Sequence, residues 1–425
     1  MRPKLNGKAE FPEQMNLMEI KFGLISTDSH VAHDRTDFTS RMSAQKWGDL
    51  IPHVMEIERG GRPVEVWGTY GKPGRASELD LCNCPAFMGE PFPSYPTRWE
   101  EVPRLAYDPA ERLKALDTDG VDAEVLFPNT GAPGMVFHGF GDAEFELDAV
   151  RAYNDTLSDW VRVSDRYLAL AILPMLQEPT VIAREIERAV EDGHKGVNVG
   201  GGGGTGPVGL PPITHPRWDP IWDACEQLGV PVHFHAGGGF GGGWGSGATK
   251  PGSWNGYTRR QDHTVYTAGC GVGPARTIPH LIFSGITQRF PRLKFVFAEN
   301  GISGFNYAIA ACDHEWEIRR LWTEGITIRP SEIIRRQMYG AFWFEDEGIK
   351  TRHDIGIDNI MWESDLPHVS SFYPRSWEVV ERILDGVGSE ERRKMLYGNA
   401  LQVYGIEPSA ISDQVLIASP GKANS

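Results

Sequence analysis

Asp28 and His30 are separated by one residue at the end of a short apolar run, residues 22–25. Because alternate side chains of an extended strand lie on the same face, this carboxylate and this imidazole point the same way and can bind one metal ion together. Three later apolar runs end in residues of the same kinds, namely His235, Glu299 and Asp365. The sequence therefore predicts that several strands carry ligand-type side chains at their C-terminal ends.

Apolar, strand-like runs alternate with amphipathic, helix-like stretches from residue 22 to about residue 405, as in a parallel sheet with crossover helices. The runs are Leu24–Thr27, Ala123–Phe127, Leu168–Ile172, Gly196–Val199, Val232–His235, Lys294–Ala298, Gly340–Phe344 and Asn359–Trp362. The clearest helical stretches are Ala143–Val163, Val181–Glu191, Asp219–Leu228, Ile302–Trp322 and Trp377–Asp385. Eight such units predict an α/β fold, a closed (β/α)₈ TIM barrel over residues 20–405, whose active site lies at the C-terminal strand ends.

Residues 34–106 form a long insertion after the first strand, rich in Gly, Pro and Trp. A strand-to-helix loop opens onto the catalytic face of such a barrel, so this segment is expected to act as a lid, or else to build an oligomer interface. Residues 406–425 lose periodicity and are expected to be a tail, disordered or packed on a neighbouring subunit. The glycine runs 200–204 and 237–243 are expected to be loops on the catalytic face that are either mobile or closely approached by another group, and the second could line an oxyanion pocket.

The formal net charge of −15 argues against nucleic acid as a partner. No run approaches the ~20 apolar residues that span a bilayer, and the first twenty residues contain no signal-peptide core, so no membrane partner and a cytoplasmic location are expected. Of the five cysteines only Cys82 and Cys84 are close in sequence, at a spacing that fits neither a zinc ribbon nor a thioredoxin motif. All five are expected to be reduced thiols.

The assignments of the candidate metal ligands depend on one another, because His30, His235 and Asp365 lie close together only if the barrel closes. Asp28 either joins them on the metal or holds a neighbouring imidazole in its tautomer. Glu299 is costly to bury at a strand end unless a cation compensates it, which favours a functional role over a salt bridge to an arginine.

The other histidines are ranked below these residues. His368 follows Asp365 by three positions and is expected in the loop above the metal, as a substrate contact or general acid. His233 lies one pleat deeper than His235 and is expected to be a core histidine bonded to a carbonyl group. His33 and His263 are second-rank candidates.

Five motifs together resemble the amidohydrolase-2 family, which includes aminocarboxymuconate-semialdehyde decarboxylase, resorcylate decarboxylases and several hydrolases of ring-fission products. They are Asp28-Ser29-His30, the run from Pro231 to His235, the run from Phe290 to Lys294, the run from Ser364 to His368, and Tyr397-Gly398-Asn399-Ala400.

The resemblance implies a (β/α)₈ barrel that holds Zn²⁺ or Mn²⁺ at its mouth through Asp28, His30, His235 and Asp365. One position departs from the decarboxylases, which carry a histidine after the sixth strand where this chain has Glu299.

Two enzymatic hypotheses follow. The first is a hydrolase or nonoxidative C–C lyase acting on a carboxylated aromatic or ring-fission-type small molecule, with Zn or Mn as cofactor and with Asp365 or Glu299 moving the proton. The second is a nonheme diiron monooxygenase of secondary metabolism, because the carboxylate-rich set with Glu299 suits iron. A non-catalytic metal-binding barrel is the remaining alternative. We also expect the chain to form a homo-oligomer.

Overall fold

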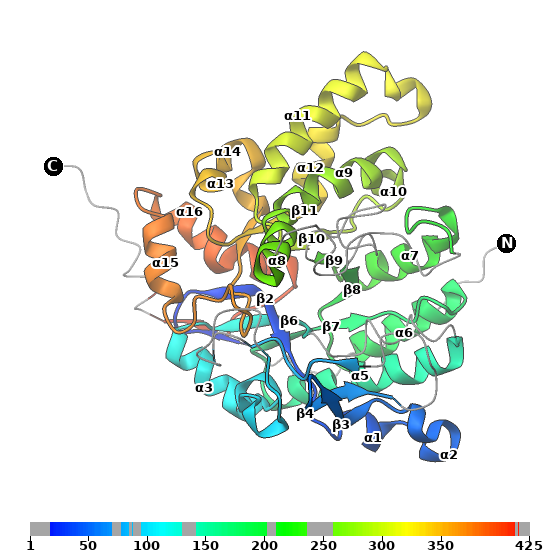
Figure 1. The fold of residues 1–425 in the computed structure, drawn as a ribbon. Helices are drawn as coiled ribbons and strands as arrows, with labels where there is room; N and C mark the ends of the chain where they lie inside the picture. Colours follow the sequence, from blue (N-terminus) through cyan, green and yellow to red (C-terminus); the bar gives the residue numbers. More distant parts are fainter. Residues whose placement is uncertain are drawn as a thin grey trace.

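The computed structural model describes residues 18–69, 78–84, 87, 95–129, 142–201, 210–235, 258–412 and 415. Eight parallel strands close into a barrel in the order β10-β11-β12-β2-β6-β7-β8-β9, with helices around it (Figure 1). The strands are β2 (Ile25–Val31), β6 (Ala123–Pro128), β7 (Tyr167–Ile172), β8 (Gly196–Gly201), β9 (Val232–His235), β10 (Phe295–Ala298), β11 (Met338–Phe342) and β12 (Ile360–Trp362). The expected (β/α)₈ barrel is confirmed.

Two helix ends coincide with caps in the sequence. Asp142 accepts hydrogen bonds from two backbone N–H groups at the start of α5 (Ala143–Val163), and Gly229 ends α7 (Asp219–Leu228) with a left-handed φ of 71°. The other α-helices are α1 (Asp37–Arg41), α2 (Ala44–Trp47), α3 (Pro109–Asp119), α6 (Pro179–Glu191), α8 (Arg259–Ala268), α9 (Gly273–Phe283), α10 (Ile286–Arg289), α11 (Ser303–Ile318), α12 (Pro330–Gln337), α13 (Asp346–Lys350), α14 (Arg352–Ile355), α15 (Ser376–Ile383), α16 (Ser389–Arg393) and α17 (Asn399–Val403).

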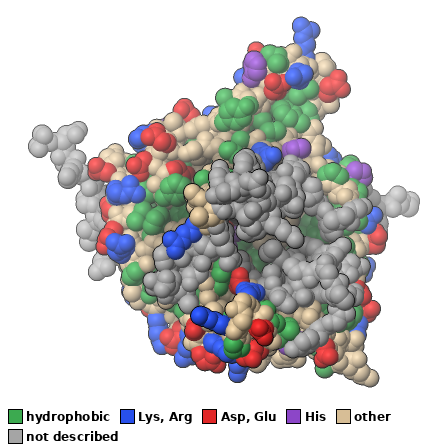
Figure 2. Space-filling model, viewed as in Figure 1, with side chains coloured by type: hydrophobic (Ala, Val, Ile, Leu, Met, Phe, Trp, Pro, Cys, Tyr) green, Lys and Arg blue, Asp and Glu red, His purple; other side chains and the backbone are tan. Residues whose placement is uncertain are grey.

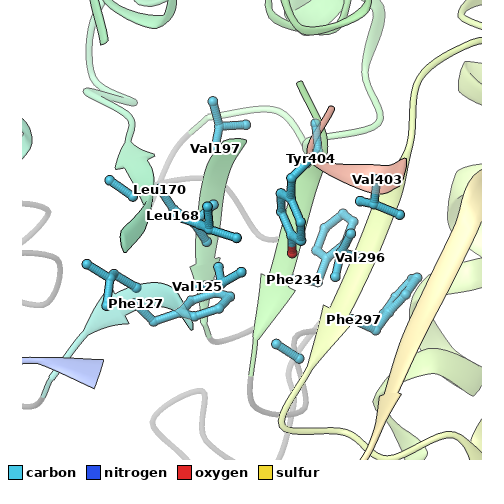
Figure 3. Packing of buried hydrophobic residues seen from close by; sticks show 14 of the residues in the cluster. Val125, Phe127, Leu168, Leu170, Val197, Phe234, Val296, Phe297, Val403 and Tyr404 are labelled. Carbon is cyan, nitrogen blue, oxygen red and sulfur yellow. The ribbon is translucent and has the colours of Figure 1, made fainter. Parts of the chain in front are cut away.

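The barrel strands are buried because helices cover their outer side and side chains fill the interior. Figure 3 shows this packing for Val125, Phe127, Leu168, Leu170, Val197, Phe234, Val296 and Phe297, together with Val403 and Tyr404. His233 belongs to this core: one ring nitrogen lies 3.1 Å from the Val197 carbonyl oxygen and the other 2.9 Å from the Tyr404 hydroxyl. The expectation of a core histidine bonded to a carbonyl group is confirmed, and burial lowers the pKa of His233 to about 3.

The insertion contains an antiparallel sheet of β3 (His53–Arg59), β4 (Arg62–Gly68) and β5 (Glu78–Leu79), which the sequence analysis does not predict. Gly60 and Gly61 form the hairpin turn with φ of 63° and 75°, a conformation that glycine adopts without strain.

Two described parts of the insertion contact loops that follow barrel strands at the C-terminal end. The Asn83 backbone N–H donates to the side chain of Asn129, which follows β6, and the Phe87 ring lies 5.5 Å from that of Tyr373, which follows β12.

Several boundaries differ from the sequence expectation by two or more residues, among them the ends of β2 and β11. β2 continues to Val31, so Asp28 and His30 lie inside the strand rather than after it. β11 ends at Phe342, two residues earlier than expected. Within the expected tail, β13 (Ala410–Ile411) pairs in parallel with β1 (Glu19–Ile20) of the same chain.

The remaining sequence expectations concern loops, thiols and membranes. Residues 202–204 and 237–243 of the glycine runs lie outside the described residues. All five cysteines are free thiols and buried. In the described part of the chain, no helix is long and apolar enough to span a bilayer.

Asp122 stabilises the entry into β2, because its carboxylate accepts hydrogen bonds of 2.6–3.0 Å from the four consecutive backbone N–H groups of residues 21–24. Replacing Asp122 with Ala leaves these groups without their acceptor, so we expect the free energy of unfolding in urea to fall by about 2–4 kcal/mol. Asp117→Ala, which removes an exposed partner of Arg166, is the control and should cost less than about 1 kcal/mol. Equal losses in the two variants would contradict this role of Asp122.

Candidate metal centre

The strand that carries Asp28 and His30 contains a bulge. The ladder between β2 and β6 shifts register between Ser26 and Ser29, and such a bulge redirects the side chains of a strand. The Ser26 hydroxyl lies 3.0 Å from that of Ser364, which follows β12, and the Ser29 and Ser364 hydroxyls are 3.2 Å apart. These contacts fix the bulged strand to the segment that carries Asp365.

The four candidate ligands come from β2, from β9 and from the segment after β12, and His30 lies close to each of the other three. Its Nε2 lies 3.4 Å from Asp28 Oδ1 and 3.1 Å from Asp365 Oδ1. His235 Nε2, at the end of β9, lies 3.2 Å from the same nitrogen and 3.5 Å from Asp28 Oδ2. The structure therefore brings Asp28, His30 and His235 together as one group whose donor atoms could hold a metal ion, and His30, Asp365 and His368 as a second group that shares His30.

The burial of Asp28 indicates what this cluster requires. Asp28 is fully buried, and neither carboxylate oxygen accepts a hydrogen bond among the described residues. A buried carboxylate without hydrogen bonds is costly unless a cation compensates it. Two imidazole nitrogens and two carboxylates form a donor set that suits Zn²⁺ or Mn²⁺, so the residues fit a divalent metal ion.

Burial also sets the protonation states of the cluster. It raises the pKa of Asp28 to about 8 and lowers the pKa of His235 to about 4. The pKa of His30 is lowered by burial and by the neighbouring His368. Burial alone would raise the pKa of Asp365, but His368 and His30 outweigh it and hold that pKa below its ordinary value. The neutral histidines are in the form that binds metals.

Glu299 lies at the edge of the cluster, with Oε2 3.5 Å from His235 Nε2. No arginine forms an ion pair with it among the described residues, so the salt-bridge alternative finds no support there. Burial raises the pKa of Glu299, and the charges of Asp365 and Asp28 raise it further. Glu299 and Asp365 both adopt left-handed backbone conformations, with φ of 53° and 57°. This conformation is strained for residues with a side chain, and such strain is concentrated at functional sites.

Glu363 is a site residue that the sequence analysis omits. It is fully buried directly after β12, and its Oε2 accepts a 2.9 Å hydrogen bond from the backbone N–H of Glu299. Its Oε1 has no hydrogen-bond partner among the described residues, and burial followed by the charge of Asp28 raises its pKa. Its position two residues before Asp365 is the signal that could have identified it, because i and i+2 share a face of extended chain.

His368 also joins the cluster. Its Nδ1 lies 2.9 Å from Asp365 Oδ1, and its ring stacks on that of His30 with centroids 3.7 Å apart. The Ser370 hydroxyl donates to the other Asp365 oxygen. His33 instead lies 3.2 Å from Asp37, and the side chain of His263 is outside the described residues.

A family model, described as amidohydrolase, matches residues 61–406. The chain belongs to the amidohydrolase family. This amidohydrolase is 25% identical over 351 residues to a 2-amino-3-carboxymuconate-6-semialdehyde decarboxylase of Dictyostelium discoideum, over 80% of the chain and 87% of the relative. It is 26% identical to a gamma-resorcylate decarboxylase of Rhizobium radiobacter, over 66% and 83%.

A solved structure of similar fold is the 5-carboxyvanillate decarboxylase of Novosphingobium aromaticivorans with bound manganese. Its TM-score to the amidohydrolase is 0.61 at 18% identity, over 90% of this chain and 97% of that one. The expected family is thus confirmed, and a solved neighbour carries one of the two metals that the resemblance implies.

Metal binding to the amidohydrolase should release a proton. Because Asp28 holds its proton up to about pH 8 without a cation, a metal ion must displace that proton at lower pH. The affinity for Mn²⁺ should therefore rise by up to about tenfold per pH unit from pH 6 to 8 and level off above it. Asp28→Asn, which removes the titrating group, should bind more weakly and lose this dependence. An affinity of the unmodified protein that is constant from pH 6 to 8 would contradict the assignment.

Proposed function

We propose that this amidohydrolase is a metal-dependent nonoxidative lyase that removes CO₂ from a carboxylated aromatic or ring-fission-type small molecule. The observation that carries the proposal is the cluster in which Asp28, His235 and Asp365 all lie within 3.5 Å of His30 Nε2, with His368 Nδ1 2.9 Å from Asp365 Oδ1. The names of the curated relatives support decarboxylation over hydrolysis, because both are decarboxylases.

The first four side chains would hold the metal ion. A bound divalent ion supplies a positive charge that polarises a substrate oxygen and stabilises negative charge as it develops. The donor atoms of Asp28, His30 and His235 lie 3.2–3.5 Å from one another, so these ligands surround one point rather than lie in a row.

Decarboxylation requires one proton. The bond between the substrate carbon and its carboxylate breaks, the electron pair stays on that carbon, CO₂ leaves, and a proton must reach the carbon. We assign delivery of the proton to His368 with Asp365. His368 Nδ1 lies 2.9 Å from Asp365 Oδ1, and the pKa of Asp365 is held below its ordinary value by His368 and His30, so Nε2, which is buried and has no hydrogen-bond partner among the described residues, is the nitrogen assigned to exchange the proton.

We propose that the insertion at residues 34–106 covers the site as a lid. The contacts of Asn83 and Phe87 with loops after β6 and β12 support this placement, because those loops follow strands whose C-terminal ends form the mouth. A lid excludes water from the reacting carbon.

A homo-oligomer is proposed from the exposed apolar side chains near the projecting helix α11 (Figure 2). These include Tyr307, Ile318 and Trp322. A cytoplasmic location is proposed from the five free, buried cysteines.

Carbon dioxide release from a panel of hydroxylated benzoic acids and carboxymuconate-type acids tests the proposal. The Mn²⁺-loaded protein should release one CO₂ per substrate, whereas His235→Ala should lose both bound metal and activity. His353→Ala removes an exposed histidine and should retain both. Release of CO₂ by metal-free His235→Ala at the rate of the unmodified protein would overturn the proposal.

Glu299 favours a second candidate, a diiron monooxygenase. The carboxylates of Glu299 and Asp28 each lie 3.5 Å from His235 Nε2. The backbone N–H of Glu299 also donates a hydrogen bond to the Glu363 carboxylate. Together with Asp28 and Asp365 the site holds four buried or half-buried carboxyl groups, and their full ionisation would give more negative charge than one divalent ion compensates. A second cation would balance this excess, and carboxylates with imidazoles suit iron. A non-catalytic barrel would bind metal without turnover.

The variant Glu299→Gln separates these candidates. If Glu299 moves a proton, the nearly isosteric amide should keep the metal content and lower the rate by about 10²–10⁴. If Glu299 completes a second metal site, the metal content should fall by about half. Metal stoichiometry and turnover are measured together, with the exposed Glu347→Gln as control. Unchanged stoichiometry and turnover would show that Glu299 serves neither role.

A further inference from the structure

A buried ion pair lies behind the metal cluster. Arg112 of α3 and Glu124 of β6 are both fully buried. The guanidinium binds the carboxylate with two hydrogen bonds of 2.8 Å, from Nε to Oε1 and from Nη2 to Oε2. This bidentate geometry fixes the plane of the guanidinium.

The remaining N–H groups of Arg112 reach backbone carbonyl oxygens. Nη2 lies 3.0 Å from the oxygen of Leu366, the residue that follows Asp365. Nη1 lies 3.4 Å from the oxygen of His30 and 3.4 Å from that of Leu105, near the end of the insertion. The side chain of Arg112 thus contacts the backbone of one candidate ligand, His30, and the backbone of the residue next to another, Asp365.

These contacts lie where regular pairing between the two ligand segments ends. β12 pairs with β2 at a single position, Trp362 with Ser26. Beyond it, Asp365 N–H donates to the Asp28 oxygen at 3.0 Å, and His30 N–H donates to the Leu366 oxygen at 2.7 Å. The Leu366 oxygen therefore accepts from both His30 and Arg112, which joins the two segments at the level of the ligands.

We propose that Arg112 is a positioning residue that holds the backbone of His30 and of the segment after Asp365 so that their side chains converge on one metal ion. The inference rests on the proposed metal centre and goes beyond it, because Arg112 touches no candidate ligand side chain. Glu124 neutralises the guanidinium and fixes its orientation. A lysine could keep this charge pairing, but its three N–H donors could not replace the five hydrogen bonds that Arg112 donates.

The test separates positioning from stability. A buried ion pair replaced by apolar residues of similar size is often neutral for stability, whereas removal of one partner leaves a buried charge and is strongly destabilising. The double variant Arg112→Met/Glu124→Leu therefore removes the hydrogen bonds to the carbonyl groups without leaving an unpaired charge. Arg112→Lys is the conservative variant. Arg352→Met/Glu391→Leu is the matched control, since that pair at 2.7 Å lies between α14 and α16.

Two measurements are made on the full chain: the dissociation constant for Mn²⁺, and the visible spectrum of the Co²⁺-substituted protein, which reports ligand geometry. We expect the Arg112 double variant and Arg112→Lys to bind Mn²⁺ about 10–100-fold more weakly and to show an altered Co²⁺ spectrum. The control pair should match the unmodified protein in both. Thermal unfolding of the metal-free proteins accompanies each comparison.

The outcomes separate the two hypotheses. Absence of metal binding in the unmodified protein would overturn the proposed function. Normal binding there with unchanged affinity and spectrum in the folded Arg112 variants would overturn only the positioning role. If the double variant does not fold, Arg112→Lys decides, because it keeps a cation beside Glu124: weaker binding with the altered spectrum supports the inference, and unchanged values reject it.

Discussion

Uncompensated negative charge inside the barrel is the constraint on which the rest of the site depends. Asp28 is buried without a hydrogen bond to its carboxylate among the described residues, and Glu363 and Asp365 are buried beside it. In a medium of low polarity such charges are stable only if protons or cations neutralise them. The raised pKa of Asp28 is the response of the protein without a cation. A divalent ion would replace this proton. Metal binding, the protonation of Asp28 and the stability of the fold are therefore linked at this one residue.

The backbone geometry serves the same requirement. A regular strand with polar residues at 26–30 would not aim its carboxylate and imidazole at a common point with residues from β9 and β12. The bulge in β2, the hydroxyl contacts with Ser364 and the hydrogen bonds to Leu366 hold the strand in its irregular form. The left-handed conformations of Glu299 and Asp365 place two further carboxylates at the cost of local strain.

Much of this architecture could be predicted from the sequence, because apolar periodicity and caps are local signals. The bounds of α5 and α7 agree with the expected ones, and Asp142 and Gly229 supply the reasons. The sequence analysis ends the first strand at Thr27, but β2 continues to Val31. The C-terminal half of the strand is polar, and it is buried because the candidate site lies there.

Two residues that the sequence analysis omits act through tertiary contacts. Arg112 resembles an ordinary charged residue of a helix, and the position of Glu363 two residues before Asp365 is a signal that does not show what its side chain contacts. Their roles follow from the backbone N–H group or carbonyl oxygens that they meet across the barrel. The hairpin of β3 and β4 has a local signal that the sequence analysis does not use, because Met55–Glu58 and Val64–Val66 alternate apolar and charged residues on the two sides of the Gly60-Gly61 turn.

The closure of the barrel between β2 and β12 has a consequence for biosynthesis. The first barrel strand has the last one as its neighbour, and outside the barrel β1 pairs with β13, more than 350 residues later. Asp28 and His30 are made before Asp365, which lies more than 300 residues later in the chain. Until β12 has been made, β2 has no neighbour on that edge of the barrel, and the hydrogen bonds that join residues 28–30 to residues 365 and 366 cannot form. The full set of candidate ligands therefore depends on a contact between distant parts of the chain and cannot assemble from local structure.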